Sequence, residues 1–476
     1  MKVETSRYLQ EKKPMLQDLL HRLLQEYPYV SILAEDSRSC VCMVSKSGTL
    51  VREDSMLTGR GAVIRVYDGT SVSEYALNRF CEEEFSLAQK TLRETLVPLE
   101  KKLPDGIQGD HAGIPADEPC VFHESTSYER HPSAIGDAKI LDALTRISEE
   151  GRAVDSRILD CRVMFSWQQY SKLFLSEHRD MLQDVMWTNG YISAVAAHGE
   201  KVESCARAFS MLGGAELLDR MEHGVEDVAR TTLELLDSQP MKPGEYECIC
   251  TPEVTGMIAH EAFGHGVEMD MFVKDRALAK QYIGKQVASP LVTMHDGASA
   301  AKETASYFFD DEGVLAHDTV VIDHGILQRG ISDSRSAQRL GTEPTGNGRR
   351  EAFDHKVYTR MTNTFFEPGT DRYEDMVKSI SYGFQLENAT SGMEDPKNWG
   401  IQCMVNIARE IKDGAFTGRI FSPVVLTGYV PDLLKSISMI SDRAELCGCG
   451  MCGKGHKEWV KVSDGGPYIK AKIRLG

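Results

Sequence analysis

The stretch MIAHEAFGHGVEMD, residues 257–270, places His260 and His265 five positions apart, with Glu261 next to the first histidine. Two imidazoles that bind one metal ion from an α-helix are usually four residues apart, which separates them by about 40° around the helix axis. Five residues turn through about 140°, so a regular helix would point the two rings apart. A shared metal site therefore requires a local change in the helix.

A π-bulge would provide that change, because one extra residue in a turn returns position i+5 to nearly the same face as position i. Gly264 and Gly266 flank His265, and each glycine weakens a regular helix by about 1 kcal/mol. We expect the helix to begin with Thr251 as its N-cap and Pro252 at its first position. The sequence thus predicts a helix that starts regularly and is distorted at the histidines.

The residue types in this stretch suit a hydrolytic metal centre. A catalytic zinc ion is held by about three protein ligands and keeps one position for water, while a nearby carboxylate takes a proton from that water. His260 and His265 supply two ligands, and Glu261 supplies the carboxylate. Glu268 and Asp270 either orient the imidazoles or form an ordinary solvated acidic face. The alternative is two ordinary histidines, since this spacing arises by chance in on the order of a few per cent of such chains.

Bulk composition narrows the class of protein. A chain of 476 residues is too long for one ordinary core and predicts two or three folding units. The formal charge of −17 argues against a nucleic-acid partner, which requires clustered Lys and Arg. No apolar run approaches the roughly 20 residues of a membrane span, and the first residues lack a secretion signal, so we expect no membrane association and a cytoplasmic location. The twelve cysteines are spread along the chain and are expected to be mostly reduced.

The first half alternates predicted helices and strands. Apolar periodicity predicts helices over 10–27, 79–97, 136–152 and 213–237. Short β-like runs follow the first helix, and three alternating runs between the last two helices predict an antiparallel meander. Residues 101–135 carry four prolines and little periodicity, which indicates an ordered surface loop or a lid. This pattern is typical of an α+β fold, with an antiparallel sheet and flanking helices.

A domain boundary is expected near residue 240. The segment DSQPMKPGEYE, residues 237–247, is the best linker in the chain. We therefore predict an N-terminal α+β domain over 1–240 and a C-terminal domain over 241–476. The second part is mostly β-like and carries the distorted helix.

Several segments of the second half resemble one known family. HEAFGHGVEMD is similar to the metallopeptidase signature of the TldD/PmbA family of bacterial and archaeal proteins. Four further segments look like later signatures of that family in the same order: GNGRR at 346–350, RMTNTFFEPG at 360–369, TGYVPDLLKSISMIS at 427–441 and CGKGHKEWVKVSDGGPYIK at 452–470. The resemblance covers most of 240–476 and is looser before it.

The resemblance implies a zinc-dependent peptidase that cleaves flexible or unfolded peptides. It places the zinc ion on His260, His265 and Cys452, with Glu261 as the base that activates the metal-bound water. Imidazole and thiolate are both good zinc ligands, and three of them leave one tetrahedral position open. The family also implies a dimer, either a homodimer or a heterodimer with a PmbA-type subunit that lacks the metal motif. The alternative function is a non-catalytic peptide-binding or scaffold subunit.

Peptide substrates of this family imply recognition by β-strand addition next to the metal. We expect GNGRR and RMTNTFFEPG to line that groove, with Arg349, Arg350 and Arg360 as partners for substrate carbonyls or for the carboxyl end. The alternative is that these arginines belong to surface turns.

Two cysteines, Cys447 and Cys449, have no place in the family pattern, and His456 stands where the family usually has glutamine. Together with Cys452 they could form a separate structural zinc or redox centre, as C-x-C-x-x-C spacing can. The group that stabilises the oxyanion is also open. Its candidates are His295, His324, His355 and His456.

Overall fold

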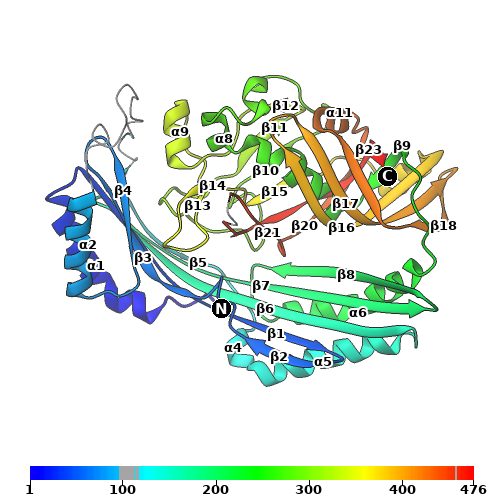
Figure 1. Ribbon diagram of the computed structural model, residues 1–476, viewed down its shortest axis with the longest axis horizontal. Coiled ribbons are helices and arrows are strands. Elements are labelled where there is room, and N and C mark those ends of the chain that lie inside the picture. Colours follow the sequence, from blue (N-terminus) through cyan, green and yellow to red (C-terminus); the bar gives the residue numbers. More distant parts are fainter. Residues whose placement is uncertain (96–112, 114–116, 456–457) are drawn as a thin grey trace.

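The computed structural model describes residues 1–95, 113, 117–455 and 458–476. It contains two large sheets with helices packed on them, which confirms the predicted α+β class (Figure 1). Across the described residues, no helix is both long and apolar enough to cross a membrane.

The first sheet has eight strands in the order β4-β3-β1-β6-β7-β5, with β2 paired to β1 and β8 paired to β7. All pairs are antiparallel except β5 with β7. The predicted meander is β6, β7 and β8, although the third strand lies after residue 200 because the first two are longer than expected. The bounds are β1 Tyr29–Ser45, β2 Gly48–Arg52, β3 Gly59–Tyr67, β4 Val72–Leu77, β5 Cys120–Ser125, β6 Ile158–Leu175, β7 Arg179–His198 and β8 Lys201–Met211.

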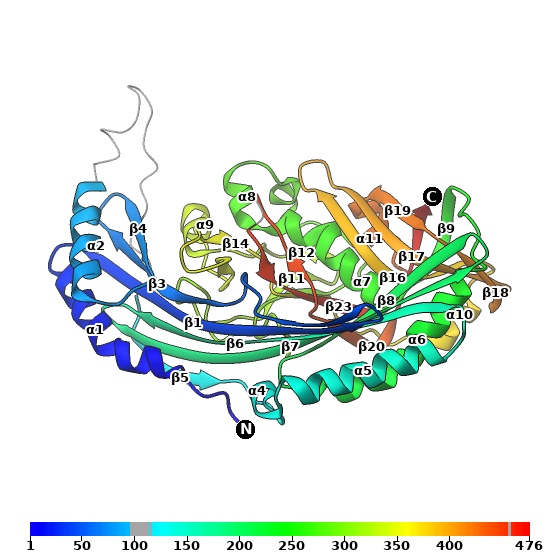
Figure 2. The same ribbon diagram turned by 60° about the horizontal axis from the view of Figure 1, so that its bottom comes forward.

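Helices cover the outer face of this sheet (Figure 2). Ser6 Oγ accepts a hydrogen bond from Leu9 N and caps the first helix, whose buried leucines pack on β1 and β3. Helices α5 and α6, whose bounds are given below, pack together on the other end of the sheet. All four predicted helices are present, within a few residues of the expected limits. The helices are α1 Arg7–Leu24, α2 Glu82–Thr95, α4 Pro132–Ile135, α5 Asp137–Ala153 and α6 Leu217–Leu235.

The predicted surface excursion at 101–135 is only partly described, because residues 96–112 and 114–116 lie outside the described part of the chain. Its later portion differs from the expected loop. Residues 120–125 form strand β5, because Phe122 packs against Phe309 from the second half. The proposed lid role falls on the residues that are not described.

The second sheet has eleven strands in the order β12-β11-β10-β15-β23-β19-β17-β16-β9, with β18 on β17 and β20 on β23. Strand β9 pairs with both β16 and β23, so five of these strands close into a small barrel. The bounds are β9 Gly244–Cys250, β10 Met294–Asp296, β11 Thr319–Asp323, β12 Ile326–Leu327, β15 Asn363–Phe366, β16 Tyr382–Asp395, β17 Gly400–Lys412, β18 Ala415–Phe421, β19 Val424–Tyr429, β20 Met439–Cys447 and β23 Ser463–Leu475.

Shorter elements connect these strands. Two small hairpins matter for the site: β13 Gly348–Arg349 with β14 Tyr358–Thr359, and β21 Met451–Cys452 with β22 Val460–Lys461. The helices are α7 Pro252–Met257, η1 Ile258–Gly264, η2 His265–Val267, α8 Met269–Val273, η3 Leu278–Tyr282, α9 Ser334–Leu340, α10 Tyr373–Lys378 and α11 Val430–Lys435.

The second half lies in the concave face of the first sheet, whose long strands β1, β6 and β7 curve beneath it (Figure 2). The linker between α6 and β9 contains residue 240, so the expected boundary falls between the strands of the two sheets. The division into two independently folding domains stays a prediction. Helix α7 packs on β23 and β16, which positions the histidine stretch against the barrel.

Candidate metal centre

The histidine stretch has the predicted distortion. Helix α7 starts at Pro252 with Thr251 as its N-cap residue and continues into the π-helix η1, which holds His260. The wider turn leaves the ring centroids of His260 and His265 only 5.3 Å apart. The expected π-bulge is therefore confirmed, and two imidazoles five residues apart do share one face.

The glycines beside His265 are needed for space. An added Cβ at Gly264 would lie 2.1 Å from Met361 Sδ, and one at Gly266 would lie 2.6 Å from Glu394 Oε1. Both glycines have ordinary negative φ angles. Their role is thus to let neighbouring side chains approach the distorted turn closely, in addition to weakening the regular helix.

Cys452 completes a group of three ligands. Its Sγ lies 3.3 Å from His260 Nε2 and 3.4 Å from His265 Nε2. A tetrahedral zinc ion with bonds of about 2.0–2.1 Å to nitrogen and 2.3 Å to sulfur would set such a pair roughly 3.6 Å apart. One donor atom from each residue lies within 4.8 Å of the other two. The three side chains therefore fit a single ion of the zinc class.

Arg360 fixes the backbone of the hairpin that carries Cys452. Its side chain is completely buried, and its guanidinium donates hydrogen bonds to the carbonyl oxygens of Cys452, at 2.5 Å, and of Glu458. These two carbonyls lie on opposite sides of the β21–β22 hairpin. The structure thus places Arg360 as a support of the hairpin, and its substrate role stays a prediction.

A buried charge network orients the second histidine. Glu268 Oε2 lies 3.3 Å from His265 Nδ1 and accepts a hydrogen bond from Lys454 Nζ at 2.9 Å. Lys454 also donates to Asp270 Oδ1 at 2.6 Å. Burial raises the pKa of Glu268, but Lys454 and His265 outweigh burial and lower it well below its usual range. A carboxylate that remains ionised here fixes the imidazole so that its Nε2 faces Cys452.

The charges within the cluster favour a thiolate between two imidazolium rings. Burial lowers the pKa of His260, but the Cys452 thiolate outweighs burial and raises it to about 9. Burial raises the pKa of Cys452, yet the two histidines together lower it to about 4. The pKa of His265 is raised well above its ordinary value, against burial, chiefly by Glu268. A cation that binds here replaces the imidazolium protons.

Glu261 is half-buried and lies against β16. An added Cβ at Gly392 would be 2.3 Å from Glu261 Cγ, so the strand contacts this side chain directly. Two further carboxyl groups flank it. Burial raises the pKa of Asp464 to about 6, and burial raises the pKa of Glu394 well above its usual range, while Gly266 N donates to Glu394 Oε2 at 2.9 Å.

Three residues of this environment were not predicted from the sequence in these roles: Lys454, Glu394 and Asp464. Lys454 stands two positions after Cys452 in the C-G-K segment. Its position close to the ligands could therefore have been predicted from the sequence. Nothing in the spacing of the other two carboxyl groups pointed to the histidine stretch.

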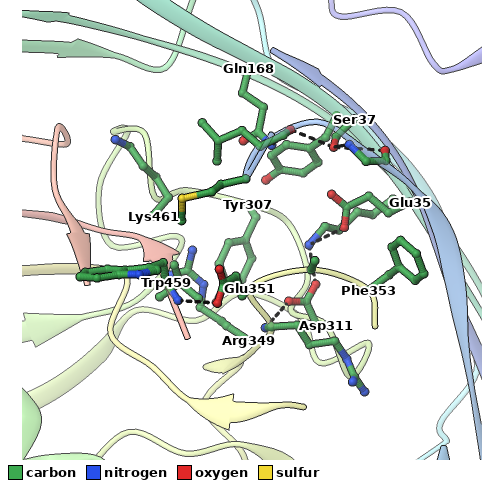
Figure 3. A pocket seen from close by; sticks show the side chains of 18 of the residues that line it. Glu35, Ser37, Gln168, Tyr307, Asp311, Arg349, Glu351, Phe353, Trp459 and Lys461 are labelled. Atoms are coloured by element: carbon green, nitrogen blue, oxygen red, sulfur yellow. Dashed lines mark hydrogen bonds and ion pairs between the residues drawn. The ribbon is translucent and has the colours of Figure 1, made fainter. Parts of the chain in front are cut away.

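A cavity of about 130 Å³ lies between the first sheet and loops of the second half (Figure 3). Arg349 faces it, donates to Met361 O at 2.7 Å and lies over the Tyr307 ring. Arg350 also lines it, but its guanidinium pairs with Glu74 of the first sheet at 2.5 Å. The cavity is lined by the residue that precedes Cys452 and by none of the three ligands. The substrate role of these two arginines stays a prediction.

The remaining candidates lie elsewhere. His295 is bound by Asp318 at 2.6 Å and Glu367 at 2.8 Å, His324 has an 80% exposed side chain, and His355 pairs with a glutamate at 2.9 Å. None of the three belongs to the ligand group. His456 lies outside the described residues.

The suggestion that Cys452 joins its neighbouring cysteines in one centre is wrong, because Cys452 faces the two histidines. Among the described residues, no group of three metal-ligating side chains contains Cys447 or Cys449.

Comparison with known proteins gives a consistent result. Residues 243–474 match the family described as PmbA/TldA metallopeptidase C-terminal domain. The chain is 27% identical to a metalloprotease of Methanothermobacter thermautotrophicus, over 78% of this chain and 81% of the relative. It is 32% identical to a metalloprotease TldD homolog of Buchnera aphidicola, over 54% of this chain and 53% of the relative, so it matches about half of that protein. The crystal structure of TldE from Thermococcus kodakarensis has the same fold, with a TM-score of 0.74 at 18% identity over 97% of this chain and all of that one.

Proposed function

Because the chain belongs to the TldD/PmbA family of metallopeptidases, we propose that it is a zinc-dependent peptidase that cleaves flexible or unfolded peptides. One observation carries the proposal. His260 on the π-helix η1, His265 at the start of the following 3₁₀ helix η2, and Cys452, 187 residues beyond His265, converge on one point beside the half-buried Glu261. A protein that only bound peptides would need neither the ligands nor the base.

We assign the ion to His260, His265 and Cys452. Two neutral imidazoles and one thiolate are a ligand set that zinc prefers, and they leave one coordination position free. When bound, zinc would lower the pKa of water and polarise the scissile carbonyl. Glu268 keeps the His265 ring oriented, and Arg360 keeps Cys452 in place on its hairpin.

Glu261 is the proposed base. It is the neighbour of His260 within η1, so the same turn that holds the ligand also positions the carboxylate. It would take a proton from the attacking water and deliver it to the leaving amine. Glu394 is a half-buried carboxyl group whose pKa burial raises well above its usual range, and in its neutral form it adds no negative charge that would repel the incoming peptide carbonyl.

Main-chain recognition suits substrates without a fixed fold. Among the described residues, β20 pairs with β23 and, through one bridge at Ser441, with Asp371, so the part of its other edge that leads to Cys447 carries no further strand and can accept an extended peptide. This strand ends at Cys447, opposite Asp464 and near the proposed base. We propose that the peptide adds to this edge, and that Arg349 binds a carbonyl or the carboxyl end.

We also propose that the chain works as a dimer, either with itself or with a PmbA-type subunit. The likeness to a TldE structure supports a partner of similar fold. Mixing purified chains and measuring mass by light scattering would distinguish these assemblies.

The test is Glu261→Gln, compared with the parent chain on a mixed library of unfolded peptides. We expect cleavage to fall by about 10³-fold or more, because the base is lost, while zinc stays at about one ion per chain. Glu253→Gln is the matched control. Glu253 lies in the first turn of α7, the helix that leads into η1, and its replacement should leave cleavage unchanged.

Cleavage by Glu261→Gln at the parent rate would refute the assigned base. A parent chain that binds zinc and peptides without cleaving them would favour the non-catalytic scaffold instead.

A further inference from the structure

Cys447 and Cys449 lie at the end of β20, in the segment C-G-C that the metal centre does not use. Both side chains are partly exposed. We propose that these two thiols are a redox modification site, a dithiol that a hydroperoxide oxidises to a disulfide. The inference concerns a different pair of sulfurs from the ligand Cys452 and does not depend on peptidase activity.

The turn between the two cysteines is held by both halves of the molecule. Gly448 N donates to Ser210 Oγ at 2.7 Å, and Gly448 O accepts from Asn189 Nδ2 at 3.2 Å, both from the first sheet. Thr304 Oγ1 donates to the same carbonyl at 2.6 Å from the other side. An added Cβ at Gly448 would lie 1.9 Å from Thr304 Oγ1, so only glycine fits. This fixed, irregular turn holds the two cysteines one residue apart at the junction of the two halves.

The Cys449 thiol donates to Phe209 O at 2.9 Å, and its other polar neighbours favour the thiolate. Asn189 Nδ2 donates to its Sγ at 3.3 Å, and Lys461 Nζ donates to Oδ1 of the same amide at 2.5 Å. Lys461 is buried beside Trp187, 4.5 Å from the ring centre, and among the described residues no carboxylate lies within ion-pair distance of it. Figure 3 shows this lysine at the border of the cavity. A cation without a carboxylate partner stabilises a nearby thiolate.

The two thiols are therefore unequal. The hydrogen bond from Cys447, and then the charge of Lys461, lower the pKa of Cys449 against burial and Glu303. The same hydrogen bond and burial raise the pKa of Cys447 well above its usual value. A reactive thiolate next to a protonated thiol is the arrangement of an attacking and a resolving cysteine.

The oxidation is balanced with a hydroperoxide, ROOH. The Cys449 thiolate attacks the peroxide, an S–O bond forms, the O–O bond breaks, and the alkoxide leaves with a proton as ROH. The Cys447 sulfur then attacks the Cys449 sulfenic acid, the S–S bond forms, and water leaves with the Cys447 proton. The two sulfurs together lose two electrons, which the peroxide gains. A dithiol reductant reverses the change by thiol–disulfide exchange.

The chain carries its own control pair. Cys40 and Cys42 have the same C-x-C spacing, and their sulfurs are 4.0 Å apart on β1. No cation is among the groups that shift them, and burial raises the pKa of both, that of Cys42 to about 12. This pair should remain as thiols when Cys447 and Cys449 are oxidised.

The experiment uses the reduced, zinc-loaded full chain treated with hydrogen peroxide, then alkylated and digested with trypsin. Residues 444–454 form one peptide with Cys447, Cys449 and Cys452, and residues 39–46 form the control peptide. We expect the first peptide to lose two hydrogens and take one alkyl group, on Cys452, reversibly with dithiothreitol. We expect the control peptide to take two. A first peptide that takes three alkyl groups at peroxide levels that oxidise other thiols would overturn the proposal.

Two variants test the mechanism. Lys461→Met should slow disulfide formation roughly tenfold, because less Cys449 is ionised; an unchanged rate would overturn the role of the lysine. Cys447→Ser removes the resolving thiol and leaves the buried lysine intact, so a sulfenic acid should accumulate on Cys449 and be trapped by dimedone. Trapping on other cysteines but not on Cys449 would refute the proposal even if the lysine variant failed to fold.

Discussion

Among the residues that the structure describes, two groups of possible metal ligands that contain a cysteine sulfur satisfy the same distance criterion. The atoms of His260, His265 and Cys452 lie within 4.8 Å of one another, and so do those of Cys40, Cys42 and Asp137. Distance alone would make each a candidate for a metal ion. Their surroundings differ, and the difference shows what else a site requires.

The first group is embedded in charge. Lys454, Glu268 and Arg360 surround it, and opposite charges within the cluster lower the pKa of Cys452 to about 4. The second group borders an apolar core, where burial raises the pKa of Cys42 to about 12. A thiol must lose its proton to bind a metal. Prearranged charge, more than proximity, therefore separates the two groups.

Removal of one ligand from each group should give the largest difference in zinc binding between the two groups. His265→Ala should weaken zinc binding by more than about 10³-fold, because two ligands no longer define a site. Asp137→Ala removes the exposed member of the other group and should leave zinc content at the parent value. Zinc quantification after dialysis measures both. Zinc lost from the Asp137 variant and retained by the His265 variant would reverse the assignment.

The pH dependence of zinc binding should be steep. The raised pKa values of His260, about 9, and His265 mean that both rings carry protons at pH 7.5, whereas Cys452, with a pKa of about 4, carries none. Zinc must displace about two imidazolium protons, so its affinity rises with pH up to about 9, by up to roughly 100-fold per unit. Calorimetry at pH 7.5 in two buffers counts the protons. Release of about one, the value for an ordinary thiol and neutral imidazoles, would contradict the charge arrangement.

The charge network around the first group can be loosened without removing a ligand. Lys454→Met should weaken zinc binding by about 10–100-fold, because Glu268 then orients His265 less firmly. Lys274→Met is the matched control. Lys274 also pairs with Asp270, at 3.0 Å, but its side chain is 46% exposed. Competition with a chelator gives the affinities, and equal losses in both variants would show that the buried network does not tune the site.

The smallest expected effect is the loss of stability when a cysteine of the second group, Cys40, Cys42 and Asp137, is replaced. Cys42→Ser should lower the free energy of unfolding by about 1–3 kcal/mol, because a hydroxyl replaces a buried thiol in an apolar core. Zinc content should not change. Denaturant titration measures the first quantity and metal analysis the second. Stabilisation of the parent chain by added zinc, absent in this variant, would identify the second group as a true metal site.

Local signals predicted much of the fold. The leucine spacing of residues 10–27 predicts α1, and the alternation after residue 157 predicts the start of the meander. The lengths of the strands were harder to predict from the sequence. Strands β6 and β7 run for 18 and 20 residues, far beyond the usual five or six. Such strands persist because the curved sheet packs on helices and on the second half.

The site was predicted in parts. The spacing of His260 and His265, with Gly264 and Gly266 beside them, indicated a π-turn that the structure contains. Cys452 could be joined to them only through a family resemblance, since no local rule connects residues 187 positions apart. The hydrogen bonds of Arg360 to the cysteine hairpin were not predicted, because they too join residues far apart in the sequence, and its expected role toward substrate stays a prediction.

By itself the sequence determined where helices begin, which turn is distorted and which side chains can bind a metal, because capping, periodicity and ligand chemistry are local properties. Only the tertiary structure decided which cysteine faces the histidines and which pair remains for other chemistry. It also decided which charges are buried beside them. Those choices depend on long-range packing and on the electrostatics of a low-dielectric interior, which no short segment of sequence specifies.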